Sequence, residues 1–212
     1  MQFNEKITLD ERWLLTILIV AVAAFIALTL SMRNGYLAQF DQNILHWFHK
    51  RKNRVLDSFF SSITWLGSLW ILLPLYIVLI LTFSHYFENV EKLLGIGFWG
   101  AFLTTYVLKY QLNRKRPYFF PIINELPIDP SFPSAHTSQI VTFTLLFWFM
   151  DYSGSSLFDA LFTGILLFIA SGVALSRMYL QVHFPTDVLA GALVAIAWSC
   201  IAILVIKSGG LA

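Results

Sequence analysis

The sequence has few charged residues. Only 12% of its 212 residues are Asp, Glu, Lys or Arg, whereas about 25% is usual for a soluble domain, and 58% are hydrophobic. The mean hydropathy is +0.70. This composition excludes an ordinary soluble domain and predicts a protein that lies in a bilayer.

The sequence also has only one cysteine and a small net charge. The single Cys200 excludes an internal disulfide and has no neighbouring metal-ligand residues, so we expect it to be a small buried apolar group. The net charge of +2 is too small to favour nucleic-acid binding. Internal repeats are lacking too, and we therefore expect residues 1–212 to form a single integral membrane domain.

Long uncharged stretches divide the chain. A membrane-spanning helix needs about 20 apolar residues, and six candidate stretches occur, at residues 13–32, 58–87, 93–108, 137–150, 160–176 and 188–206. They predict an all-α fold, a six-transmembrane-helix bundle. The first stretch lacks a following small-residue cleavage site, so we expect a retained anchor. Pro74 is expected to kink the second.

Two connecting segments have distinctive patterns. Phe40, Ile44 and Phe48 recur every four residues and precede a basic run at 50–54, which predicts an interfacial amphipathic helix between the first two spans, in contact with anionic lipid. Residues 110–135, between spans three and four, hold five of the seven prolines and predict a rigid active-site loop. On that loop, Arg114 and Lys115 are expected to recruit anionic lipid.

Titratable residues gather at the ends of the predicted helices. If the chain crosses the membrane at each span, one side receives Lys109, His136, Arg177, His183 and Asp187. Spans three and four are short, with uncharged stretches of about 24 and 21 Å at 1.5 Å per residue, so Lys109 and His136 should lie at headgroup level. Ionisable residues at such depths indicate a functional site.

These residues form three ordered blocks. The first is Lys109 with Arg116 and Pro117, the second is Pro133-Ser134-Ala135-His136, and the third is Ser176-Arg177 with His183 and Asp187. The pattern resembles that of the type 2 phosphatidic acid phosphatase superfamily, Lys-x6-Arg-Pro, Pro-Ser-Gly-His and Ser-Arg-x5-His-x3-Asp. Ala135 stands where the family usually has glycine, and alanine disfavours a positive φ there.

Each residue type suits phosphate chemistry. Lys109, Arg116 and Arg177 supply cations, and arginine can grip two phosphate oxygens. Ser134 and the backbone N–H groups at the start of the fourth span, from Ala135, can donate hydrogen bonds to an anion. Asp187, four residues after His183, can hold one ring nitrogen and direct the other at phosphorus. His183 is then the nucleophile, and His136 the general acid.

The resemblance adds a mechanism. It implies a phosphohistidine at His183 that water hydrolyses, with no metal ion and no cofactor. The predicted site face also lacks the carboxylate cluster that a magnesium site would need. Singly, Lys109 and Arg177 could be explained by the helix dipole and Ser134 as an N-cap, but the residues of all three blocks, at these spacings on one face, favour a joint function. His46 and His49 have no third ligand and are expected to be solvated.

The predicted activity is that of a membrane lipid phosphatase. Its substrate would be an anionic lipid with a phosphate or diphosphate headgroup, such as phosphatidylglycerol phosphate, undecaprenyl diphosphate or phosphatidic acid. A lipid A phosphatase and a lipid-to-lipid phosphotransferase are alternatives with the same site; a vanadate-dependent haloperoxidase or a non-catalytic lipid-binding protein fit less well. We expect neither a nucleic-acid partner nor an obligate protein partner; the expected partners are the lipid substrate and a bilayer with anionic lipids.

The two indicators of orientation disagree. Ten of the 14 Lys and Arg residues fall on the catalytic side, which the positive-inside rule places in the cytoplasm. Three of these cations, Lys109, Arg116 and Arg177, are explained by phosphate binding. The resemblance also implies an active site outside the cytoplasmic membrane, as in bacterial members of the family. We therefore expect a multi-pass protein of the bacterial cytoplasmic (inner) membrane whose active site lies on the outer, periplasmic or extracellular, face.

Overall fold

A computed structural model describes residues 10–84, 89–120, 127–148 and 156–209 of the chain. Within those ranges the chain is helical and contains no β-strand, which confirms the all-α prediction. The elements are α1 (Glu11–Arg33), α2 (Ala38–His49), α3 (Arg54–Ile63), the 3-10 turn η2 (Thr64–Gly67), α4 (Leu69–Phe83), α5 (Val90–Leu112), α6 (Ala135–Trp148), α7 (Ser156–Tyr179) and α8 (Pro185–Gly209). Residues 85–88, 121–126 and 149–155, which include the predicted span ends at 87 and 150 and part of the proline-rich loop, lie outside the described residues.

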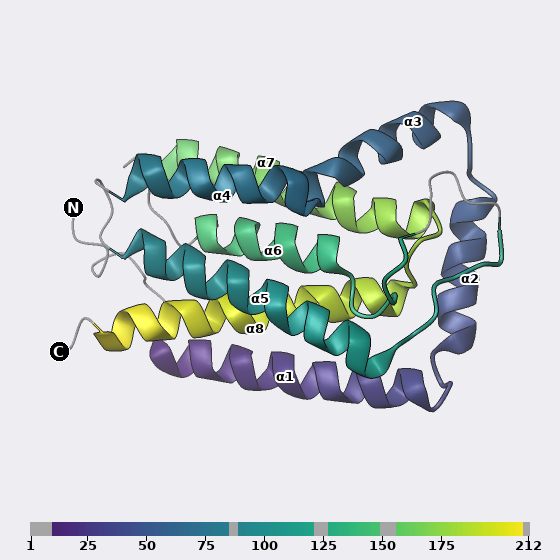
Figure 1. The fold of residues 1–212 in the computed structure, drawn as a ribbon, viewed down its shortest axis with the longest axis horizontal. Coiled ribbons are helices and arrows are strands. Elements are labelled where there is room, and N and C mark those ends of the chain that lie inside the picture. The colour runs from purple at the N-terminus through teal and green to yellow at the C-terminus, as the bar shows by residue number, and fades with distance from the viewer. Residues whose placement is uncertain (1–9, 85–88, 121–126, 149–155, 210–212) are drawn as a thin grey trace.

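The axes of the long helices are roughly aligned. Helices α1, α4, α5, α6, α7 and α8 run roughly along a common axis, whereas α2 lies across one end of the bundle and α3 is inclined to it (Figure 1). The same end holds the chain between α5 and α6 and the turn between α7 and α8 (Figure 1). The segments that carry the three sequence blocks therefore meet at one end of the molecule.

Several helices are long and apolar enough to cross a membrane. These are α1, α8 and residues Leu157–Tyr179 of α7, with mean hydropathies of 2.7, 2.6 and 2.0 over their most apolar windows. Helix α3 with η2 and α4 would make a fourth span if the bent pair is counted as one. The chain is thus an integral membrane protein, and the six-span layout stays a prediction, with α5 and α6 at the positions expected for spans three and four.

The second predicted span breaks at a different place from the one expected. The bend of 44° lies between Arg54–Gly67 and Leu69–Phe83, whereas Pro74 lies inside α4. Gly67 explains the position of the break, because a Cβ there would lie 2.5 Å from Cγ1 of Val173 and 3.2 Å from the carbonyl oxygen of His136. The turn η2 therefore packs directly against α6 and α7, which a side chain at Gly67 would prevent.

The expected amphipathic helix forms as α2. Asp41, Leu45 and Phe48 are buried, whereas Phe40 is 44% exposed. Phe40 and Ile44 instead line an apolar groove of about 630 Å³ between α2, α7 and α8. Ile44 also packs against the buried cluster that contains Phe48. The amphipathic pattern thus predicted the helix correctly, and its contact with anionic lipid stays a prediction.

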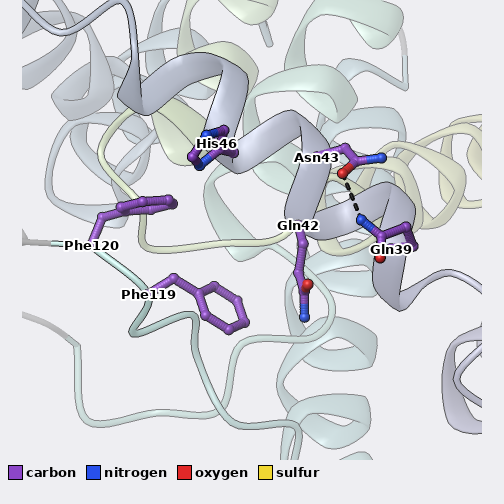
Figure 2. Close-up of a pocket in the computed structure, with 6 residues that line it drawn as sticks. All are labelled: Gln39, Gln42, Asn43, His46, Phe119 and Phe120. Atoms are coloured by element: carbon purple, nitrogen blue, oxygen red, sulfur yellow. Dashed lines mark hydrogen bonds between the residues drawn. The ribbon is translucent and has the colours of Figure 1, made fainter.

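A second hollow separates α2 from the loop that precedes α6. Its volume is about 240 Å³, and Figure 2 shows it lined by α2 side chains and two loop phenylalanines, namely Gln39, Gln42, Asn43, His46, Phe119 and Phe120. The ring of Phe120 stacks on His49 at 4.0 Å and lies 5.5 Å from His46. Both α2 histidines therefore contact the loop, with His46 exposed, as expected for a solvated residue, and His49 partly buried.

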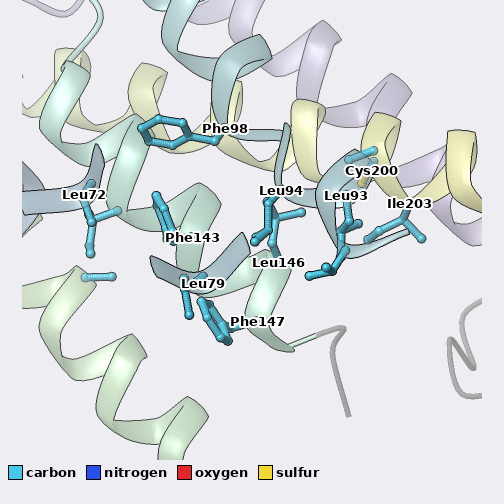
Figure 3. Close-up of a cluster of buried hydrophobic side chains, with 14 of the residues drawn as sticks. Leu72, Leu79, Leu93, Leu94, Phe98, Phe143, Leu146, Phe147, Cys200 and Ile203 are labelled. Carbon is cyan, nitrogen blue, oxygen red and sulfur yellow. The ribbon is translucent and has the colours of Figure 1, made fainter. Parts of the chain in front are cut away.

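The core is built around α8. This helix packs against α1, α5 and α6, and half of its most apolar window is buried, compared with 11% for α1. Leu93, Phe98, Phe143 and Ile203 belong to the buried cluster at its side (Figure 3). Cys200 lies in the same cluster, 5% exposed, which confirms the expectation of a buried apolar role.

A glycine brings α8 close to the start of α6. A Cβ on Gly191 would lie 2.5 Å from the carbonyl oxygen of Ser134 and 3.3 Å from the backbone nitrogen of Ser138. Small residues permit such close backbone approach between membrane helices. This contact places the N-terminal end of α6 against the first turns of α8.

Candidate active site

The structure gathers the predicted site residues at one end of the bundle. They come from the last turns of α5 and α7, the loop before α6 and the first turns of α6 and α8: Lys109, Arg116, Ser134, Ala135, His136, Arg177, His183 and Asp187. These residues interact electrostatically: the pKa of His183 is lowered by Arg116, Lys109, Arg177 and His136. Residues far apart in the chain are therefore neighbours here.

His183 lies at the centre of this group. Its ring is 1% exposed, with Nδ1 3.4 Å from Oδ2 of Asp187 and Nε2 3.2 Å from Nη1 of Arg116. Burial, followed by the cations Arg116, Lys109 and Arg177, holds the pKa of His183 well below its usual value. Because Oδ2 of Asp187 is an acceptor and Nη1 of Arg116 is a donor, these two contacts favour a ring with its proton on Nδ1 and its lone pair on Nε2.

The turn between α7 and α8 fixes that histidine. Gln181 has a φ of 60°, and the N–H groups of Val182 and His183 both donate to the carbonyl of Arg177 at 3.1 Å. This left-handed residue ends α7 as C-cap motifs do. Asp187 accepts from the N–H of Phe184 at 2.8 Å, which holds the carboxylate beside the His183 ring.

Lys109 and Arg116 share a carboxylate that the sequence pattern did not identify. Asp129 accepts from Nζ of Lys109 at 2.9 Å and from Nη2 of Arg116 at 2.8 Å. Burial would raise the pKa of the Asp129 carboxyl, but Lys109 and Arg116 outweigh it and lower the pKa. Asp129 therefore stays ionised and keeps both cations beside His183.

Arg177 has a free donor in the site. Its Nη1 donates to Oγ1 of Thr64 at 2.6 Å, and the side chain is buried. Among the residues that the structure describes, its Nε has no hydrogen-bond partner. A buried guanidinium donor without a partner is costly, and an anion bound in the site would satisfy it. Thr64 escaped prediction because it lies in the middle of an apolar stretch.

The start of α6 supplies the remaining groups. Ser134 is buried, its N–H donates to the carbonyl of Asp187 at 3.0 Å, and its hydroxyl accepts from Thr137 at 3.0 Å. Ala135 is not among the described residues with positive φ, so its backbone does not need glycine. His136 is only partly buried, so it is more accessible than His183.

Arg114 does not lie free at the membrane surface as expected. Its guanidinium bonds to Asp41 and to Asp187, both at 2.6 Å, and lies over the ring of Phe184. The neighbouring Lys115 is exposed. Only Lys115 of this pair therefore remains a candidate for lipid recruitment.

The family follows from a match that covers more than half of the chain. The family model of the PAP2 superfamily matches residues 91–209. The chain belongs to the PAP2 superfamily. This finding confirms the resemblance to the type 2 phosphatidic acid phosphatases, and the match contains all three sequence blocks. Arg114 also lies inside it, whereas Asp41 and Thr64 lie outside.

Two curated proteins are similar to this PAP2 chain. Phosphatidylglycerophosphatase B of Bacillus subtilis (strain 168) is 32% identical over 143 residues, which cover 64% of this chain and 68% of that protein. The "Putative undecaprenyl-diphosphatase YbjG" of Escherichia coli (strain K12) is 43% identical over 67 residues, 31% of this chain and 29% of that protein. Both names describe enzymes that remove phosphate from lipids.

Two solved structures share the fold. A transmembrane PAP2-type phosphatidylglycerolphosphate phosphatase from Bacillus subtilis superposes with a TM-score of 0.80 at 26% identity, over 90% of this chain and 96% of that one. LpxE of Aquifex aeolicus gives a TM-score of 0.64 at 27% identity, over 77% of this chain and 94% of that one. The bundle is therefore that of a transmembrane PAP2 protein.

Proposed function

We propose that this protein is a membrane lipid phosphatase that acts through a phosphohistidine on His183. The substrate is an anionic lipid whose phosphate or diphosphate lies at headgroup level. Three findings support the proposal: the PAP2 family match, the names of the similar proteins and the long apolar helices, at whose ends the site residues lie.

One observation carries the proposal. The neutral, buried His183 has Nδ1 at Asp187 and Nε2 within the group of cations formed by Arg116, Lys109 and Arg177. A nucleophile needs a lone pair directed at the reacting atom, and phosphoryl transfer needs positive charge around the equatorial oxygens. Both requirements meet at Nε2, and the unpaired Nε of Arg177 is a donor ready for a phosphate oxygen.

The first chemical step forms a nitrogen–phosphorus bond. Nε2 of His183 attacks phosphorus, and the bond from phosphorus to the leaving oxygen breaks. His136 donates its proton to that oxygen, which departs as an alcohol or a phosphate. Asp187 accepts the hydrogen bond from Nδ1 and stabilises the positive charge that develops on the ring of His183.

The second step regenerates the enzyme. A water molecule gives a proton to His136, its oxygen bonds to phosphorus, and the nitrogen–phosphorus bond breaks. Inorganic phosphate leaves, and both histidines return to their starting protonation states. In this scheme no metal ion takes part, because Lys109, Arg116 and Arg177 supply the positive charge.

Phosphatidylglycerol phosphate is the first substrate to test. The similar protein that covers most of this chain is a phosphatidylglycerophosphatase, and the structure with a TM-score of 0.80 is named for the same activity. Undecaprenyl diphosphate, phosphatidic acid and lipid A are the comparison substrates, since each presents an anionic phosphate at the same depth.

The test is phosphate release by purified protein in detergent, with EDTA present. We expect inorganic phosphate from at least one of the four lipids, at the same rate with and without EDTA, and none from the His183→Ala variant. Transfer of labelled phosphate to a second lipid without release would show a phosphotransferase. Loss of turnover in EDTA, restored by added magnesium, would contradict the metal-free mechanism.

A further inference from the structure

A network of hydrogen bonds surrounds Oδ1 of Asp187, the carboxylate oxygen that does not contact His183. Arg114 bonds through Nη1 to Oδ1 of Asp187 and through Nη2 to Oδ2 of Asp41, both at 2.6 Å. Thr186 accepts from Arg114 at 2.7 Å and donates through its hydroxyl to Asp41 at 2.8 Å. Its backbone N–H also donates to Asp41, at 3.1 Å. Helix α2, the loop before α6 and helix α8 are thus joined at one point.

This network is buried. The Asp41 and Asp187 side chains are 1% and 0% exposed, and that of Arg114 is 16% exposed beneath the ring of Phe184, whose centroid lies 4.1 Å away. Removing one partner from a buried ionic group leaves the other charge uncompensated, which is strongly unfavourable. Asp41, Arg114 and Asp187 therefore hold one another in a single geometry.

The two carboxylate oxygens of Asp187 have different partners. Oδ1 is held by Arg114, and Oδ2 is left for the N–H of Phe184 and Nδ1 of His183. Asp41 bonds to the other end of the Arg114 guanidinium, so its negative charge reduces the net positive charge that Arg114 places beside Asp187. Without Asp41, Arg114 would offset more of the charge of Asp187.

We propose that Asp41 and Arg114 are positioning residues for His183, acting through Asp187. Arg114 fixes the rotamer of Asp187 so that Oδ2 faces Nδ1, and Asp41 balances the charge of Arg114. This inference rests on the proposed function, in which His183 attacks phosphorus. It also gives α2, which lies outside the family match, a part in the site.

Charged groups reach His183 from every element around it. Lys109 comes from α5, Arg116 from the loop, His136 from α6, Arg177 from α7 and Asp187 from α8. Four of these are cations or can become cations, and Asp187 is the carboxylate that contacts the ring. A change in the charge balance behind Asp187 therefore changes the protonation of His183 directly.

The first experiment measures kcat and the acid limb of kcat/KM against pH for Asp41→Asn, for the double variant Asp41→Asn with Arg114→Gln, and for Arg114→Lys. Removing the partner that orients a metal-bound histidine typically costs about 10–100-fold, and we expect a similar loss of kcat in the first two variants. KM should change little, because neither residue belongs to the proposed phosphate site.

The pH profile separates positioning from folding. Asp41→Asn leaves Arg114 unbalanced, which lowers the pKa of His183 and moves the acid limb to lower pH. The double variant removes both charges, so the limb should return to its original position while kcat stays low. Arg114→Lys keeps the charge balance and should keep the limb and part of kcat. Gly164→Ala, in α7, where a Cβ would meet no atom within 4 Å, is the control with unchanged kcat and limb.

A second readout does not depend on turnover. Nitrogen-15 chemical shifts of the His183 imidazole, assigned by their absence in His183→Gln, report which nitrogen bears the proton. We expect Nδ1–H in the original protein and in Arg114→Lys, and a mixture of tautomers in the double variant. An inactive protein that shows these shifts would contradict the proposed function alone. The inference itself is overturned by one tautomer in all variants, or by Asp41→Asn with unchanged kcat and pH limb.

Discussion

The two histidines of the site differ in their surroundings. His183 is buried and bonded to Asp187, whereas His136 is partly exposed at the first turn of α6. This difference suits a nucleophile that is held in place and a general acid that must reach the leaving group. The residue types alone do not separate the two proposed roles; the proposal assigns them from the position of Asp187, which the spacing of His183 and Asp187 already indicated.

The division of labour can be tested with the leaving group. His136→Ala should slow the hydrolysis of a lipid phosphate by about 10²–10⁴-fold, the usual contribution of a general acid. A p-nitrophenyl ester, whose leaving group needs no proton, should recover much of that loss. His183→Ala should remain inactive with both substrates, and equal rescue of the two variants would show that the roles are assigned incorrectly.

Nη1 of Arg116 lies 3.2 Å from Nε2 of His183, the proposed nucleophilic nitrogen. Arg116→Lys keeps the charge and loses the planar fork, so we expect kcat/KM to fall by roughly 10–100-fold, as for the loss of a hydrogen bond to a charged group worth about 1.5–3 kcal/mol. The loss should be nearly independent of salt, because the site is buried.

The exposed Lys115 is the matched control for Arg116. Lys115→Gln should raise the apparent KM on anionic vesicles at low salt, and the difference from the original protein should vanish as salt screens the surface. An Arg116→Lys variant with full activity, beside a Lys115→Gln variant that is inactive at every salt concentration, would mean that Arg116 does not bind the phosphate.

Motif spacing identified eight residues that the fold gathers, but not the groups that hold them. Asp129, Thr64 and Asp41 lie in a loop, an apolar stretch and an amphipathic segment, and each meets its partner only in the folded chain. The prediction for Arg114 was wrong for the same reason. In the sequence it stands in a run of cations, which predicts a solvated side chain, and its partners Asp41 and Asp187 meet it only in the folded chain.

At the scale of helices, the charged residues in the sequence predicted the ends of the first and last helices to within a few residues. The stretches 13–32 and 188–206 correspond to α1 and α8, whose bounds extend past them by a few residues into charged turns. The break at Thr64–Gly67 was missed because its cause is the contact of Gly67 with α6 and α7, which no local pattern reveals. Proline is the local sequence signal for a kink, so the sequence predicted the kink at Pro74.

The contact of α8 with α6 depends on Gly191. Gly191→Ala would place a Cβ 2.5 Å from the carbonyl oxygen of Ser134, so the start of α6 must move. We expect a loss of about 1–3 kcal/mol in stability, the usual cost of overpacking, together with lower kcat, because Ser134 and His136 move with the helix. Thermal unfolding in detergent and phosphate release measure the two effects.

Gly164 of α7 provides the matched control. A Cβ there meets no atom within 4 Å, and alanine is favoured over glycine inside a helix by roughly 0.5–1 kcal/mol. Gly164→Ala should therefore keep full activity and unfold at the same or a slightly higher temperature. A Gly191→Ala protein as stable and active as Gly164→Ala would refute the close contact of α8 with α6.

At the scale of the whole molecule, the site lies at one end of the bundle and the start of α1 at the other (Figure 1). We predict that the site faces outward from the cytoplasmic membrane. In a Cys200→Ser background, Lys115→Cys in the loop should react with a membrane-impermeant thiol reagent on intact cells after removal of any outer membrane. Glu11→Cys, at the opposite end, should react only after lysis, and the reverse pattern would place the site in the cytoplasm.

The central claim is that His183 carries the phosphoryl group. Its most direct test is to mix the protein with a phosphorus-32-labelled lipid phosphate, stop the reaction in alkali, where phosphohistidine survives, and map the labelled peptide by mass spectrometry. We predict acid-labile label on His183 in the original protein, formed within a single turnover, and no label in His183→Ala. Label on another residue, or lipid hydrolysis by His183→Ala, would contradict the account.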